Sequence, residues 1–188
     1  MLSMEQIVDA VLADGLDKFS MPTIAARLGV AHSGLYRYVQ DRDDLVVQVM
    51  STIATRATWP DVDLPWREQL EQIGDSIWAL CDTYPGYAIT AVQAKNVSPG
   101  FVERLSPYVD SMHEQGLDVV AATAAIEFVR TIVLMSSIEA ARFGRIQDEP
   151  DIPDNSIPGF ADAEKQSRRG WYGRHLRTYL DGLAQQIA

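Results

Sequence analysis

A short segment at residues 32–39 carries side chains that can contact nucleic acid. If this segment is helical, its outward face presents His32, Ser33, Gly34, Tyr36, Arg37 and Tyr38. An arginine can bind a guanine edge or a phosphate, histidine and serine can read base edges, and tyrosine hydroxyls can hold phosphates. Exposed aromatic rings beside an arginine have little use on a surface that meets only solvent. We therefore expect this face to contact DNA.

The elements that must position this face have the anatomy of a helix-turn-helix over residues 20–45. Ser20 is a good N-cap for the first helix, and Pro22 lies in its first turn, where a missing N–H costs nothing. Gly29 supplies the tight turn, and Leu35 belongs to the core side of a second helix of about two turns. Two turns are enough to fill a major groove.

Apolar residues at helical spacing continue through the rest of the chain, and convincing period-two strands are absent. A helix over 3–14 precedes the motif, and Asp41 can cap a helix that runs to about residue 56. Further helices are predicted at 66–84, 87–95, 99–115, 118–145 and about 164–187.

Prolines and aspartates divide this helical chain. Two prolines and two aspartates interrupt every helical pattern in 59–65, which predicts a linker there. The segment 146–159 is expected to be an exposed loop. The predicted fold is all-α. We expect an N-terminal three-helix helix-turn-helix domain over 1–56 and a C-terminal helical ligand-binding and dimerisation domain over 57–188.

The helix-turn-helix resembles that of the Tet repressor family of bacterial transcriptional repressors. The residues that carry the likeness are Leu28-Gly29-Val30, Leu35-Tyr36, Tyr38 and Arg42, within a match over about 5–53. The resemblance implies that Tyr36 and Arg42 anchor the DNA backbone. It also implies that Ser20 and Thr23 donate hydrogen bonds from the start of the preceding helix. The chain departs from the family in a shorter connection at 14–19 and in having no basic arm ahead of the domain.

Weaker motifs at 65–70, 84–86 and 115–117 extend the resemblance toward the subgroup closest to the Tet repressor itself. The family implies a repressor that a small-molecule effector releases from double-stranded operator DNA. Aromatic and soft side chains on the helices of the body are the candidates for the effector cavity: Trp78, Cys81, Tyr84, Tyr87, Met112, His113, Phe128 and Met135. His113 and Tyr87 are the polar groups expected to orient a partly aromatic or apolar ligand, and Asn96 is a weaker choice. The same residues at helical spacing are also typical of plain core.

The segment 118–145 is apolar almost all round, so a helix there must be buried on more than one side. One side can face the domain interior and the other a second subunit, paired with the last helix. This predicts a four-helix homodimer interface that includes Ile126, Val133, Trp171, Leu176, Tyr179, Leu180 and Leu183. Two recognition helices about 34 to 36 Å apart would then meet successive major grooves.

The charge balance is acidic, which is unusual for a nucleic-acid binder. The whole chain carries a net charge of −10, and residues 1–56 hold five basic and seven acidic side chains. Because non-specific affinity scales with the number of phosphates neutralised, we expect a shallow salt dependence of DNA binding. The acidity also keeps open a second interpretation, a helical ligand-binding or adaptor protein whose DNA-binding head is inactive.

Other classes of function find little support in the residues. Cys81 has no partner for a disulfide or a CxxC motif, and the acidic stretch 148–154 lacks the spacing of a calcium loop, so no metal or cofactor is predicted. An enzyme would need Cys81 as nucleophile and His113 as base, and no sequence motif brings them together. The first residues lack a basic stretch ahead of an apolar run, and no run of about 18 apolar residues occurs. A cytoplasmic protein without membrane contact is expected.

Overall fold

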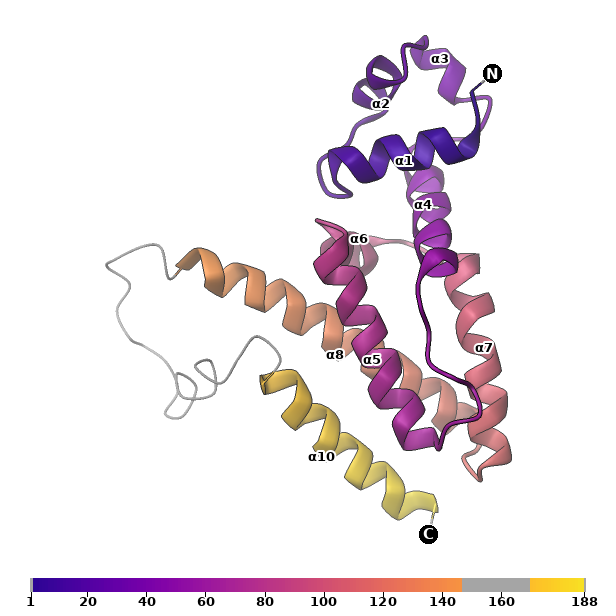
Figure 1. Cartoon of the computed structure of the whole chain (residues 1–188), viewed down its shortest axis with the longest axis vertical. Coiled ribbons are helices and arrows are strands. Elements are labelled where there is room, and N and C mark those ends of the chain that lie inside the picture. Colours follow the sequence, from indigo (N-terminus) through magenta and orange to yellow (C-terminus); the bar gives the residue numbers. More distant parts are fainter. Residues whose placement is uncertain (1, 147–169, 188) are drawn as a thin grey trace. The chain divides into compact units, whose positions relative to one another are not determined.

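Helices form all the regular structure of residues 2–146 and 170–187, which are the residues that the computed structural model describes (Figure 1). In chain order they are α1 (Met4–Asp14), α2 (Met21–Arg27), α3 (His32–Leu35), α4 (Arg42–Arg56), α5 (Trp66–Thr83), α6 (Tyr87–Gln93), α7 (Pro99–Glu114), α8 (Val119–Ile146) and α10 (Gly170–Ile187). The predicted all-α class is confirmed.

Two compact units make up the chain. The first unit joins Met1–Trp59 with Ala79–Pro107, and the second joins Pro60–Trp78 with Tyr108–Ala188. The division by packing thus groups α6 and the start of α7 with the N-terminal helices. The division predicted from the sequence, after residue 56, separates the DNA-binding part of the chain from the ligand-binding and dimerisation part. That functional division remains a prediction.

Helix ends in the first unit follow the capping residues. The Ser3 hydroxyl accepts from the Gln6 N–H at 3.2 Å, and the Gln6 side chain accepts from the Ser3 N–H at 3.0 Å, so α1 begins with a reciprocal capping box. Asp41 caps α4 by accepting from the Asp44 N–H at 2.8 Å. Buried apolar residues then hold α1 against α4, with Ile7 and Ile53 fully buried.

The start of α7 lies unusually close to α4. The Gly100 N–H donates to the Ser51 hydroxyl at 3.0 Å, and a Cβ on Gly100 would lie 2.6 Å from the Ser51 carbonyl oxygen. Arg104 donates to the Thr55 carbonyl at 3.3 Å, and Trp59 packs edge-to-face on Phe101 with ring centroids 5.8 Å apart. The first two contacts join α4 to α7, and the third joins α7 to the segment that follows α4.

In the second unit, a buried amide organises the segment before α5. The Gln69 side chain is fully buried, and its Nε2 donates to the carbonyls of Val62 and Leu64 at 2.7 and 2.6 Å and to the Ser111 hydroxyl at 2.8 Å. A buried donor stabilises only when its partners are present, so Gln69 fixes the predicted linker 59–65 in one path.

The pair α8 and α10 forms another part of the second unit (Figure 1). By length and composition alone, Val119–Arg142 of α8 could cross a membrane, with a mean hydropathy of 1.7. One such helix is weak support for a membrane span, and only 33% of this stretch is buried in the described structure. The helix therefore keeps an apolar face that the described part of its own chain does not cover.

Most predicted helix boundaries agree with the structure to within two residues. The recognition segment is the exception, because its α-helix ends at Leu35 and residues 36–38 form a turn instead of a second helical turn. The predicted loop 146–159 lies almost wholly outside the described residues, as does the stretch 164–169 of the last predicted helix.

Candidate nucleic-acid interface

Buried apolar residues fix the short helix α3 and the turn after it. Leu35 is fully buried and Val39 is 3% exposed, and the N–H groups of Tyr38 and Val39 both donate to the Leu35 carbonyl, at 2.9 and 3.2 Å. Gly29 adopts φ 65° between α2 and α3, a left-handed conformation that costs a glycine little. The chain thereby turns sharply enough to present α3 on the surface.

Four of the predicted contact residues lie on the exposed side of this turn. His32, Ser33, Tyr36 and Arg37 are all exposed, and Tyr36 keeps 48% of its surface accessible despite its size. The rings of His32 and Tyr36 meet edge-to-face with centroids 5.1 Å apart. The pair therefore holds both rings in one orientation at the surface.

Gly34 and Tyr38 are less exposed than the sequence suggested. Gly34 is half-buried, and a Cβ there would meet only Val30, at 3.8 Å. Tyr38 is also half-buried, and its hydroxyl donates to the Leu2 carbonyl. The expectation that Tyr38 faces outward with a hydroxyl free for phosphate is therefore corrected, because its proton is engaged within the first unit.

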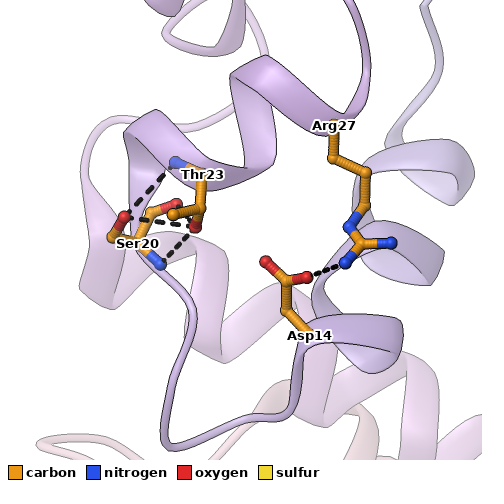
Figure 2. A network of polar contacts seen from close by, with 4 residues as sticks. All are labelled: Asp14, Ser20, Thr23 and Arg27. Carbon is orange, nitrogen blue, oxygen red and sulfur yellow. Dashed lines mark hydrogen bonds and ion pairs between the residues drawn. The ribbon is translucent and has the colours of Figure 1, made fainter.

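Ser20 and Thr23 form the capping box at the start of α2 (Figure 2). The Ser20 hydroxyl accepts from the Thr23 N–H at 3.3 Å, and the Thr23 hydroxyl accepts from the Ser20 N–H at 3.0 Å and donates to the Ser20 carbonyl at 2.8 Å. In the same view, Arg27 at the other end of α2 pairs with Asp14 at the end of α1. Both hydroxyls therefore stabilise the start of α2. To donate a hydrogen bond to a phosphate, either hydroxyl would have to break one of these capping bonds.

Arg42 begins α4 and is exposed. Its guanidinium lies over the Phe19 ring, 4.5 Å from the centroid. This cation–π contact restrains the side chain without neutralising its charge. Arg42 therefore remains able to bind an anion.

Some basic side chains of residues 1–56 form ion pairs with carboxylates, and others do not. Arg56 contacts Asp9 at 2.9 Å and Glu5 at 3.7 Å, and the hydrogen bond with Asp9 raises its pKa above the ordinary value. Arg27 is likewise paired, whereas Lys18, Arg37 and Arg42 have no carboxylate within 4 Å in the described part of the chain. Two of the three unpaired cations of residues 1–56 thus belong to the recognition turn and the start of α4.

Comparison with known proteins agrees with this geometry. Residues 9–49, which include α2, α3 and the start of α4, match the family model described as bacterial regulatory proteins, tetR family. The helix-turn-helix segment of this chain is thus similar to that of the tetR family.

Solved structures of tetR-family proteins share the fold of the entire chain. The Streptomyces coelicolor TetR family protein ActR, in complex with actinorhodin, has a TM-score of 0.80 at 22% identity, over 100% of this chain and 97% of ActR. TetR from Acinetobacter baumannii AYE has a TM-score of 0.76 at 18% identity, over 100% and 99%. A possible TetR family regulator from Streptomyces coelicolor A3(2) has a TM-score of 0.75 at 17% identity, over 97% and 99%. No curated protein matches the sequence.

The candidate effector residues of this chain differ in burial and in the unit to which they belong. Cys81, Tyr84 and Tyr87 belong to the first unit, and the other five belong to the second. Trp78, Tyr87 and Met112 are buried, with Met112 fully so. His113 is exposed, and its Nδ1–H donates to the Leu117 carbonyl at 2.9 Å, so it closes the end of α7. Asn96 is exposed as well.

Most of the predicted interface residues are buried within the single chain. Ile126, Val133, Leu176, Leu180 and Leu183 are at most 6% exposed, and the side chain of Trp171 lies outside those described. These five residues are thus covered within their own chain, and their part in a dimer interface stays a prediction. Of the predicted set, only Tyr179 is known to reach the surface.

The exposed apolar surface of α8 and α10 lies on a neighbouring face. Of its residues, the sequence analysis assigned Tyr179 to the dimer interface, whereas Phe128 and Met135 were predicted to line the effector cavity. A hollow of about 590 Å³ there is lined by Phe128, Ile132, Met135, His175 and Tyr179, among others. Phe128 stacks on Tyr179 with centroids 3.9 Å apart, and burial raises the pKa of the Tyr179 hydroxyl. The i, i+4, i+7 spacing of the three α8 residues was visible in the sequence. Because α8 is apolar on all sides, its sequence alone does not show which row of residues at this spacing is buried in its own chain and which is exposed.

Proposed function

We propose that this protein is a cytoplasmic repressor that binds operator DNA as a homodimer and is released by a small-molecule effector. The observation that carries the DNA-binding part is the selective pairing of charges. Arg27 and Arg56 are held by carboxylates, while Arg37 and Arg42 stay unpaired beside the exposed Tyr36. Unpaired cations on an otherwise acidic surface are what phosphate contacts require.

Within this interface the contacts fall into two groups. His32, Ser33 and Arg37 are exposed on α3 and the turn and are the candidates for base edges. Tyr36 and Arg42 are the candidates for backbone phosphates. Ser20 and Thr23 contribute mainly by fixing the start of α2, and Tyr38 by tying the recognition turn to Leu2.

The homodimer uses the apolar hollow of α8 and α10. Phe128 and Met135 are 36% and 44% exposed, and large apolar side chains grouped on one face mark an interaction surface. A two-fold axis through this face would pair α8 and α10 with their copies, because an isologous interface repeats the same patch. The four-helix arrangement predicted from the sequence is kept, with different residues at its centre.

The effector is proposed from the structural relatives. ActR is seen with actinorhodin, and a variant of the Acinetobacter TetR with minocycline, both of which are organic small molecules. In the second unit of this chain, the buried aromatic and sulfur side chains of Trp78 and Met112 suit a partly aromatic ligand. Binding would shift the population of dimers away from the spacing that two successive major grooves require.

Fluorescence anisotropy with DNA from upstream of the protein's own gene, at low salt, tests the proposal. Tyr36→Ala and Arg37→Ala should each weaken binding, because their side chains lie on the exposed recognition turn. Arg130→Ala is the matched control, since Arg130 lies on α8 and pairs with Glu127 at 2.8 Å. Equal, weak binding by all four proteins would instead favour the ligand-binding protein with an inactive head.

A further inference from the structure

Lys18, the third unpaired cation of residues 1–56, lies in the turn between α1 and α2. The backbone of this turn is fixed, because the N–H groups of Lys18 and Phe19 both donate to the Gly15 carbonyl at 3.2 Å. The Lys18 side chain is exposed and has no carboxylate within 4 Å in the described part of the chain. Its charge is therefore held at a defined place on the surface of the first unit and is open to a ligand.

Phe19 brings this charge close to Arg42 at the start of α4. The Phe19 side chain is 3% exposed, and the Arg42 guanidinium covers its ring, 4.5 Å from the centroid. Because neighbouring Cα atoms are about 3.8 Å apart, the exposed Lys18 side chain leaves the backbone beside this contact. Two unpaired cations from separate segments, the turn before α2 and the first turn of α4, thus border the same part of the surface.

The carboxylates at the start of α4 are engaged with other groups. Asp41 accepts from the Asp44 N–H and Asp44 accepts from the Gln40 N–H, at 2.8 Å in both cases. The Asp43 carboxylate lies 2.5 Å from the Lys95 ammonium, and this hydrogen bond lowers the pKa of Asp43. The three acidic residues therefore flank the first arginine of α4 without forming an ion pair with it.

Asp17 precedes Lys18 in the sequence, yet its carboxylate is packed against the turn between α5 and α6. A Cβ on Gly86 of that turn would lie 2.5 Å from Asp17 Oδ1 and 2.7 Å from the Asp17 backbone nitrogen. Lys18 and Arg42 thus remain unpaired in a segment where acidic residues outnumber basic ones. Lysine and arginine both donate charge-assisted hydrogen bonds to phosphate oxygens, so an uncompensated pair of them suits a ligand that carries phosphates.

We propose that Lys18 and Arg42 together bind two successive phosphates of one DNA strand, an inference that rests on the proposed DNA binding. Phosphate contacts fix the register and orientation of a protein on the duplex and carry no sequence information. This phosphate clamp therefore positions the recognition turn equally on every sequence, whereas the exposed residues of α3 discriminate between base edges. The cation–π contact with Phe19 holds the Arg42 end of the clamp in place before DNA arrives. The DNA interface thereby extends to the turn before α2, which the sequence analysis did not include.

Fluorescence anisotropy of the full chain between about 50 and 200 mM salt tests the clamp on two duplexes, DNA from upstream of the protein's own gene and a scrambled duplex of the same composition. Lys18→Gln should weaken binding to both duplexes by the same factor, about tenfold or more at about 0.1 M salt. The slope of log affinity against log salt should become shallower by about 1.8, because each of two heads loses one phosphate contact. Lys18→Arg keeps the charge and should restore the wild-type slope.

Arg130→Gln is the matched control, because it removes one positive charge from α8 of the second unit, where Arg130 pairs with Glu127 at 2.8 Å. It should leave both the affinity and the slope unchanged. Thermal unfolding of Lys18→Gln should match the wild type, since the replaced side chain is exposed. A wild-type slope in Lys18→Gln, or a loss of affinity confined to the upstream DNA, would overturn the clamp and leave the proposed repressor intact. If the wild-type protein binds neither duplex at any salt concentration, the proposed DNA binding fails together with the clamp.

Discussion

Replacing Gly100 by alanine is expected to destabilise the protein, because α4 and α7 meet there with no room for a Cβ. The new carbon would lie 2.6 Å from the Ser51 carbonyl oxygen, against about 3.4 Å for an ordinary contact, so the two backbones must separate by about 0.8 Å. The obstacle is backbone and cannot rotate away. Separation also lengthens the 3.0 Å hydrogen bond from the Gly100 N–H to the Ser51 hydroxyl.

The expected cost follows from these two effects. Overpacking costs about 1–3 kcal/mol and a weakened hydrogen bond about 0.5–1.5 kcal/mol, while alanine recovers at most about 1 kcal/mol of helix propensity. A net loss of about 1–3 kcal/mol should lower Tm by roughly 3–10 °C in a chain of this size. Thermal unfolding followed by circular dichroism measures the change.

Two further variants separate the possible causes. Ser51→Ala removes the hydrogen bond without adding a clash, so it should cost only about 0.5–1.5 kcal/mol. Gly182→Ala on α10 is the control, because a Cβ there meets nothing within 4 Å and should raise stability by about 0.5–1 kcal/mol. If Gly100→Ala unfolds at or above the wild-type temperature, the close approach of α4 and α7 is not as described.

Four other outcomes are expected. Gly34→Ala should fold normally, because its Cβ meets only Val30 at 3.8 Å, yet lose about fivefold or more in DNA affinity if the recognition turn approaches DNA closely; unchanged anisotropy would argue against that approach. Tyr38→Phe removes the hydrogen bond to Leu2 and should lower the free energy of unfolding in urea by about 0.5–1.5 kcal/mol, with an unchanged midpoint as the contrary result. The slope of log affinity against log salt should be no steeper than about −5, because two heads offer about three unpaired cations each; a slope of about −8 would contradict the charge pairing. Phe128→Glu should convert a dimer to a monomer in light scattering, whereas Val120→Glu, at a position 78% exposed outside the hollow, should not; a Phe128→Glu dimer would exclude this interface.

Local signals in the sequence were sufficient for most helix boundaries. Ser20 and Asp41 act as N-caps as predicted, because capping depends on residues only three positions apart. Ser3, predicted only as the start of the first helix, caps α1 in the same way. The recognition segment was predicted two turns long and has a shorter α-helix, because the buried Leu35 accepts from the N–H groups of Tyr38 and Val39 in a turn that follows the helix. The distribution of exposed residues around it was largely anticipated.

Long-range contacts account for what the sequence did not reveal. Tyr38 reaches Leu2 across 36 positions, and Arg56 reaches Asp9 across 47, so no periodicity could report either contact. The orientation of α8 was equally hidden, because apolar residues lie all around this helix and only its packing in the folded chain distinguishes the buried Val133 from the exposed Met135. Charge counting over 1–56 gave the correct total without showing that the paired cations lie away from the recognition turn.

The pairing of Arg27 and Arg56 with carboxylates bears on how such a protein would search a genome. A chromosome offers a vast excess of non-operator sequence, and a regulator with many outward cations spends most of its time bound there. With half of its head's arginines neutralised internally, this protein would remain largely free between encounters. It would reach its operator by repeated diffusion through the cell fluid more than by sliding, and a small number of copies would sustain occupancy because few are sequestered elsewhere.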